Sequence, residues 1–249
     1  MAAALKYQSD LAVGLLPDCR TCAIGALGVY AAAHATGPAV VAGARHGTSI
    51  ARANALLTRA AEHQSQIRML RRGWAVRVAQ LNDGRRQVLS FILPGDLFDL
   101  EALLLLSEGT SSYTTRALTD VEFCTFSTTA MHALVNSTTE QSRRFQTYLQ
   151  NQLALYGRRL TDLGQRAAPG RMSNLLLELH NRLAERGLAK DGVYEMPARQ
   201  DDLADALGLT PVHVNRTLRG LRERGLIDFD RGVMRLLDMR GLEIVAEEE

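Results

Sequence analysis

The sequence contains few cysteines, very few lysines and no long apolar run. Three cysteines among 249 residues are too few, and odd in number, for a disulfide framework, which favours a reducing, cytoplasmic environment. The densest apolar run, residues 102–106, falls far short of the roughly 18 residues of a transmembrane helix, so we expect no membrane partner. The N-terminal segment also lacks the basic and apolar regions of a secretory signal.

Neither sign of charge is in excess, because 29 lysines and arginines face 27 aspartates and glutamates and leave a formal net charge of +2. Only Lys6 and Lys190 are lysines, so 27 of the 29 cations (29 − 2) are arginines. This balance does not by itself indicate a nucleic-acid partner, which must be sought in local clusters of cations. GxxxxGK, HExxH and GxSxG motifs are absent, so we do not expect an enzyme.

Residues 46–136 show the pattern of a small antiparallel β domain. Two apolar or alternating segments, 74–81 and 86–93, flank a turn that contains Asp83-Gly84, and Asp-Gly between such segments is a strong hairpin signal. We therefore predict a barrel or roll. It is preceded by an N-terminal extension, residues 1–45, that carries a pair of cysteines.

Residues 137–168 are expected to form one long helix and a hinge, with the sequence Ala-Ala-Pro-Gly at 167–170 breaking the helix. Apolar residues recur at alternating spacings of four and three, a 3.5-residue repeat. Such a repeat is typical of a coiled-coil seam between two copies of a helix, and it also fits an amphipathic helix packed on its own domain. The predicted dimer seam consists of Phe145, Leu149, Leu153, Tyr156, Leu160 and Leu163.

The strongest local signal lies in the C-terminal third of the chain. A predicted helix, residues 199–207, is followed by Gly208, which allows a tight turn. Thr210 is a suitable N-cap, and Pro211 suits the first position of a second helix, residues 211–224. This order predicts a helix-turn-helix, whose second helix enters the DNA major groove.

A wing and a cationic helix face complete the predicted DNA-binding domain, residues 169–249. Two short strands around Asp230-Arg231-Gly232 follow the second helix. Residues 211–224 hold four arginines against a single acid, Glu223. The candidate DNA contacts are Thr210, Pro211, Val212, His213, Asn215, Arg216, Arg219 and Arg222.

These candidate contacts have different expected roles. Arg216 lies in the first half of the helix, where an arginine can bond both O6 and N7 of guanine. Arg219 and Arg222 are expected to hold phosphates, which position a protein without specifying sequence. His213 could contact a base or a phosphate, or it could be exposed without a role. The alternative for the whole face is a solvated basic surface.

The chain resembles the CRP/FNR family of transcription regulators over roughly residues 15–240, most specifically at residues 73–96 and 201–218. The resemblance implies an α+β fold with an N-terminal antiparallel β-roll of the cyclic-nucleotide-binding type, a long dimerisation helix and a C-terminal winged helix-turn-helix. It implies a homodimer on promoter DNA with half-sites about one helical turn apart, and RNA polymerase as a partner. Val212 stands where the family commonly has glutamate, so the resemblance does not predict the half-site sequence.

The resemblance does not extend to a cyclic-AMP site. Members that bind cyclic AMP carry Gly-Glu in the roll and, about ten residues later, an arginine that neutralises the cyclic phosphate. This chain has Gly95-Asp96 and then Ser111-Ser112-Tyr113, without the arginine. Burial of the phosphate without a cation is costly, so cyclic AMP is not expected as a ligand.

A further group of arginines is expected along a solvated strand edge of the roll. Residues 82–86 within it are an alternative contact for RNA polymerase. The group comprises Arg68, Arg71, Arg72, Arg77, Arg85 and Arg86.

Cys19, Cys22 and Cys124 are similar to ligands of the iron–sulfur sensors in the FNR branch. Those proteins hold a [4Fe–4S] cluster with an N-terminal Cys-x2-Cys pair, a cysteine six residues further on and one in the roll, and such clusters require thiolate ligands. The position six residues on is Gly28 here, so a fourth ligand would come from Asp18, His34, Asp120, a small molecule or water. An iron atom of the cluster without a protein ligand has an open coordination position, which suits a sensor of O2 or NO.

The same cysteines allow other interpretations. The Cys19–Cys22 pair could hold zinc, form a redox-switched disulfide or have no function, and Cys124 could be a buried core thiol. A thioredoxin-like enzyme is not expected, because no βαβ pattern surrounds the pair. Haem binding through His46, His63 or His132 is a further alternative.

Overall fold

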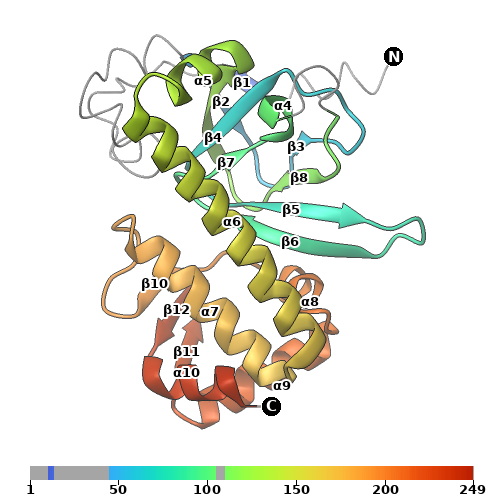
Figure 1. Ribbon diagram of the computed structural model, residues 1–249. Helices are drawn as coiled ribbons and strands as arrows, with labels where there is room; N and C mark the ends of the chain where they lie inside the picture. Colours follow the sequence, from blue (N-terminus) through green and yellow to red (C-terminus); the bar gives the residue numbers. More distant parts are fainter. Residues whose placement is uncertain (1–10, 14–44, 105–109, 249) are drawn as a thin grey trace. The chain divides into compact units, whose positions relative to one another are not determined.

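The computed structural model describes residues 11–13, 45–104 and 110–248 (Figure 1). The chain divides at Gln152, within helix α6 (Thr139–Gln165), into two compact units, and Arg86–Leu89 group with the second unit. Cys19, Cys22 and most of the predicted N-terminal extension lie outside the described residues. In the described ranges, no helix combines the length and the hydrophobicity that crossing a membrane requires.

The first unit contains two antiparallel sheets, as the sequence predicts. Their strand orders are β1-β2-β9-β4-β7 and β3-β8-β5-β6. The strands are β1 (Leu11–Val13), β2 (Arg45–Ala51), β3 (Leu56–Thr58), β4 (Gln66–Arg72), β5 (Ala75–Gln80), β6 (Arg86–Ile92), β7 (Leu97–Phe98), β8 (Thr114–Ala117) and β9 (Val121–Ser127).

The β5–β6 hairpin has the predicted turn. Gly84 adopts a φ of +86°, which favours glycine, and the Leu81 N–H donates to the Arg85 carbonyl at 2.8 Å. Strand β4 was not predicted, because arginines occupy three of its seven positions and obscure the alternation of buried and exposed residues. Its central residues Met69 and Leu70 are nonetheless buried in the roll.

Arg68 of β4 lies inside the roll, so its assignment to a solvated edge was wrong. Its side chain is 12% exposed and forms an ion pair with Asp99 at 3.0 Å. Its guanidinium also lies over the rings of Phe98 and Phe123, 5.9 and 5.7 Å from their centroids. Asp99 accepts a further hydrogen bond from Thr58 Oγ1 at 2.6 Å. Burial raises the pKa of Asp99 to about 6, because desolvation outweighs the attraction of Arg68.

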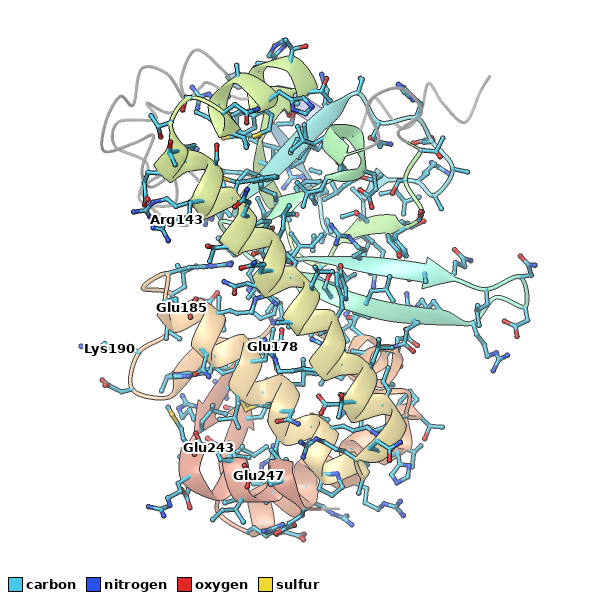
Figure 2. The ribbon with its side chains drawn as sticks, in the orientation of Figure 1. Arg143, Glu178, Glu185, Lys190, Glu243 and Glu247 are labelled. Carbon is cyan, nitrogen blue, oxygen red and sulfur yellow. The ribbon has the colours of Figure 1, made fainter. Side chains whose placement is uncertain are left out.

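Helices α4 (Glu101–Leu104), α5 (Thr128–Val135) and the first part of α6 complete the first unit. At the start of α6, Glu140 accepts hydrogen bonds from Arg143 at 3.0 Å and from Arg144 at 2.8 Å; Figure 2 labels Arg143. One turn later the helix joins the core of the roll, where Phe145 packs in the same buried cluster as Cys124. The α6 helix is therefore anchored to the roll through its first turns.

The second unit consists of the rest of α6, four further helices and a three-stranded antiparallel sheet of order β10-β12-β11. Pro169 lies in the first turn of α7, where its missing N–H costs nothing, so the predicted break at 167–170 is only a short link between α6 and α7. The elements are α7 (Ala168–Ala184), β10 (Val193–Glu195), α8 (Gln200–Leu207), α9 (Pro211–Glu223), β11 (Ile227–Asp230), β12 (Val233–Leu236) and α10 (Met239–Glu247).

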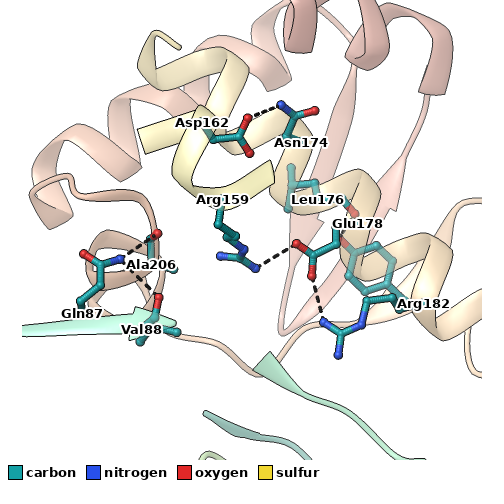
Figure 3. Close-up of polar contacts among 10 residues, drawn as sticks. Gln87, Val88, Arg159, Asp162, Asn174, Leu176, Glu178, Arg182 and Ala206 are labelled. Atoms are coloured by element: carbon teal, nitrogen blue, oxygen red, sulfur yellow. Dashed lines mark hydrogen bonds and ion pairs between the residues drawn. The ribbon is translucent and has the colours of Figure 1, made fainter. Parts of the chain in front are cut away.

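Polar contacts join α6 to α7 in this unit (Figure 3). Glu178 accepts hydrogen bonds from Arg159 at 3.1 Å and from Arg182 at 2.9 Å, and all three side chains are at most 15% exposed. Asn174 donates to Asp162 at 2.7 Å. A paired, buried network of this kind fixes the register of the two helices, because breaking it would leave a charge buried and uncompensated.

Candidate nucleic-acid interface

Helices α8 and α9 form the predicted helix-turn-helix. The turn is made by Gly208, which has a φ of +64° and ends α8. Thr210 caps α9 by accepting a hydrogen bond from the His213 N–H at 3.2 Å, and Pro211 occupies the first turn. Each of these signals was local in the sequence, and the structure confirms all three.

One face of α9 packs inward and the opposite face is exposed. Val214, Leu218 and Leu221 are buried, as predicted, and Thr217 is buried beside them. The candidate contacts Thr210, Pro211, Val212, Asn215, Arg216, Arg219 and Arg222 are exposed, and His213 is half-buried. In the described part of the chain, the face proposed to meet DNA is therefore largely exposed.

Residues of α6 and α7 contact the turn and support it. Arg171 of α7 donates to the Leu207 carbonyl at 3.0 Å and to the Arg166 carbonyl at 2.7 Å. A Cβ added to Gly208 would lie 3.3 Å from Leu163 Cδ2, so no larger residue fits there without strain. This support holds α8 and α9 in one mutual orientation.

The cationic side chains of α9 have different neighbours. Arg216 donates a hydrogen bond to His213 Nε2, one turn earlier on the exposed face. Arg219 makes only a long, exposed ion pair with Glu223, at 3.6 Å. Arg222 donates to the Phe229 carbonyl at 2.9 Å and so connects α9 to strand β11. The three arginines thus differ in how strongly contacts within the chain hold their guanidinium groups.

The wing lies between β11 and β12, as the sequence predicts. Asp230 pairs with Val233, and the two residues between them, Arg231 and Gly232, have φ values of +47° and +79°. The side chain of Arg231 is 90% exposed at the tip. Arg231 was not among the predicted DNA contacts, although its place at the centre of the Asp-Arg-Gly turn could have indicated it.

A hollow of about 290 Å³ beside α9 was also not predicted. Arg216, Arg224 and His213 line it from α9, and Ala168 and Pro169 line it from the first turn of α7. No side chain caps that turn, and helix N-termini favour anions. The hollow thus combines two arginines with an uncapped helix N-terminus, and no single stretch of sequence contains both.

Two exposed acids of this unit, Glu243 and Glu247, lie on α10 and are labelled in Figure 2. Helix α9 carries the exposed arginines together with one exposed acid, Glu223. Helix α9 is therefore locally basic, which the near-zero net charge of the chain conceals.

The predicted dimer seam is divided between two faces of α6. Phe145 is 6% exposed in the core of the roll, Leu149 packs against that core, Tyr156 is half-buried, and Leu163 is half-buried near Gly208. Leu153 and Leu160 are 71% and 72% exposed. Leu153 and Leu160 are thus the two most exposed of the six predicted residues.

Cys124 is the one of the three proposed cysteine ligands that lies in the described residues. It lies on β9 between β2 and β4, is 3% exposed, and has its Sγ 4.0 Å from Thr48 Oγ1. Among the described residues no group of three histidines, cysteines or acids could hold a metal ion. Asp120 accepts hydrogen bonds from Arg52 at 2.7 Å and Ala53 at 2.9 Å, which lower its pKa. The described residues alone therefore do not make an iron site.

The other sensor candidates also have structural roles in the roll. The Asp96 carboxylate, 3% exposed, accepts from the Leu93 N–H at 2.7 Å and closes the Pro-Gly turn. Ser111 is buried and donates to the Tyr113 carbonyl at 2.8 Å. Arg68 is the buried cation of the roll, and Asp99 already neutralises it. These side chains are therefore engaged in contacts within the roll.

Comparison with known proteins identifies a domain family for each of the two units. Residues 50–138 match the cyclic nucleotide-binding domain, and residues 170–244 match the Crp-like helix-turn-helix domain. The nitrogen fixation regulation protein FixK of Bradyrhizobium diazoefficiens is 30% identical over 166 residues, 67% of this chain and 68% of that protein. The structure of FixK2 from Bradyrhizobium japonicum has the same fold, with a TM-score of 0.71 and 23% identity over 81% of this chain and 98% of that one.

A CRP/FNR family transcriptional regulator of Thermus thermophilus, TTHA1359, is similar with a TM-score of 0.61 and 25% identity, over 81% of this chain and 98% of that one. The predicted α+β fold, a β-roll followed by a helix-turn-helix, is confirmed, and the similar proteins are regulators, not enzymes. This chain belongs to the CRP/FNR family of DNA-binding transcription regulators.

Proposed function

We propose that this protein binds promoter DNA sequence-specifically as a homodimer, with α9 as the recognition helix. One observation carries the proposal: α9 is fixed on its buried face and capped at its N-terminus, while its opposite face exposes Asn215, Arg216 and Arg219. In helix-turn-helix proteins the N-terminal part of the second helix reaches the base edges. Asn215 and Arg216 are in that part.

The contacts of each arginine within the chain suggest its role on DNA. Arg216, held by His213, is proposed to read guanine O6 and N7, because a positioned guanidinium makes this bidentate contact. Arg219 is proposed to hold a phosphate. Arg224 and the uncapped first turn of α7 suit a second phosphate in the hollow between them. Arg222 is proposed to support the wing through Phe229.

The proposed dimer uses a narrower seam than the sequence predicted. Leu153, Gly157, Leu160 and Gly164 follow one another at spacings of four, three and four along the exposed face of α6. A Cβ added to either glycine would meet nothing within 4 Å, so the fold of one chain does not require glycine there. Glycine inside a helix costs about 1 kcal/mol relative to alanine, and close approach of a second helix would account for it.

Substitution of single arginines tests the proposed division of roles. Arg216→Ala should abolish the preference for cognate over random duplex DNA, whereas Arg219→Ala should weaken binding to all sequences and make the salt dependence shallower. Arg52→Ala, an equally exposed change on the roll, is the control and should leave both unchanged. Equal losses on cognate and random DNA for Arg216→Ala would contradict its proposed role.

Sensing of a signal and binding of RNA polymerase are two further predictions, separate from DNA binding. Cys124 shares a core cluster with Phe145 of α6, so a chemical change at Cys124 would reach the helix that carries the proposed seam. This supports redox sensing through the cysteines, whether Cys19, Cys22 and Cys124 hold an iron–sulfur cluster or the thiols act alone. For RNA polymerase, the support is that the hairpin tip, residues 82–85, is exposed.

A further inference from the structure

Val212, at 80% exposed, is the most exposed large hydrophobic residue in the described part of the chain. It is the second residue of α9, directly after Pro211, which is exposed as well. At this exposure Val212 contributes little to the packing of the described residues. Its place at the N-terminal end of the proposed recognition helix fits a contact outside the chain, because that end is the part that reaches base edges.

Val212 shares one stripe with the proposed base contacts. Residues three, four and seven positions apart lie on one helix face, and Asn215, Arg216 and Arg219 stand at these distances from Val212. The stripe carries a methyl-bearing side chain, an amide and two guanidinium groups. The one carboxylate of α9, Glu223, stands at its C-terminal end, four residues after Arg219 and eleven after Val212.

We propose that Val212 selects thymine by contact with its C5-methyl group, close to the guanine that Arg216 reads. This inference rests on the proposed function. A valine side chain can neither donate nor accept a hydrogen bond, and thymine's methyl group is the one apolar feature that a base presents in the major groove. A carboxylate would instead accept from cytosine N4, so a chain with valine here favours T where an acid would favour C.

The spacing within α9 limits where that thymine lies. Val212 and Arg216 are four residues apart, which corresponds to about 6 Å along the helix axis. Consecutive base pairs are about 3.4 Å apart, so the two side chains reach pairs one or two steps apart. Asn215, between them on the same stripe, suits adenine through N6 and N7. The expected half-site therefore contains G and T within two steps of each other.

Replacement of thymine by uracil tests this inference without altering the hydrogen-bonding pattern of the DNA. Duplexes would first be selected from random sequence with the full chain, and each thymine of the half-site would then be replaced in turn by uracil. At one thymine, wild-type binding should weaken about fourfold per half-site, the value for one buried methyl group. Val212→Ala should bind thymine and uracil duplexes within twofold of each other, and Val212→Ile should keep the discrimination.

The outcomes separate this inference from the proposed function. Because Val212 is exposed, its variants should unfold at the same temperature as the wild type, and this is checked first. Selective DNA binding that no uracil substitution changes, or discrimination that survives in Val212→Ala, overturns the inference alone. A chain that selects no DNA sequence overturns the proposed function and the inference together.

Discussion

Truncation of Leu160 should weaken the dimer without destabilising the folded chain. Leu160→Ala removes three carbon groups worth about 0.8 kcal/mol each when fully buried, or about 2.4 kcal/mol in total. The side chain is 72% exposed in one chain, so about 1.7 kcal/mol is at stake in each copy. A symmetric pair contains the residue twice, which gives about 3.5 kcal/mol, or roughly a 300-fold weaker dimer.

Sedimentation equilibrium over a range of concentrations measures this dissociation constant directly. Ile244→Ala is the matched control, because Ile244 is 55% exposed on α10 and outside the seam. At concentrations at which each chain is monomeric, both variants should unfold at the wild-type temperature, because dimer formation itself would raise it. Dimerisation of Leu160→Ala as tight as that of the control, or a wild type that is monomeric at all concentrations, would refute the reasoning.

Three further predictions follow from individual contacts. Because burial raises the pKa of Asp99 to about 6, above its ordinary value of 3.8, protonation favours the folded chain. The difference in unfolding free energy between wild type and Asp99→Asn should therefore rise by about 1 kcal/mol from pH 7 to 5, and a difference independent of pH would contradict this. Gly208→Ala should destabilise by about 1–2 kcal/mol through its positive φ, and by more than Gly225→Ala, which has a similar φ and open space around it; equal losses would show that the contact with Leu163 is unimportant. Anaerobic reconstitution with iron and sulfide should give broad absorbance near 400 nm that Cys124→Ser diminishes, whereas the absence of bound iron and sulfide would end the cluster hypothesis.

The helix-turn-helix could be predicted from the sequence because its signals are local. The cap at Thr210, the proline after it and the glycine of the turn each act on residues nearby in the sequence. All three occur in the structure as predicted. The hairpin at Gly84 was predicted for the same reason. An element whose conformation is set by its own residues can therefore be predicted from the local sequence.

Features that depend on distant parts of the chain could not be predicted in the same way. Arg68 looked like a surface residue because its partner, Asp99, is far along the chain and its aromatic neighbours come from other strands. The apolar repeat of α6 was recognised, but periodicity alone cannot tell that Phe145 faces the roll while Leu160 faces outward. The hollow beside α9 is lined by residues of both α7 and α9, so no single sequence motif could predict it.

Selection of duplexes from random DNA with the purified full chain tests whether a symmetric pair of chains reads DNA through α9. We expect an inverted repeat whose half-site centres are about 10 base pairs apart, because two copies of α9 would enter successive major grooves. We also expect that Arg216→Ala enriches no motif. A single unrepeated site, or an inverted repeat that Arg216→Ala enriches equally well, would contradict the claim that a symmetric pair reads DNA through α9.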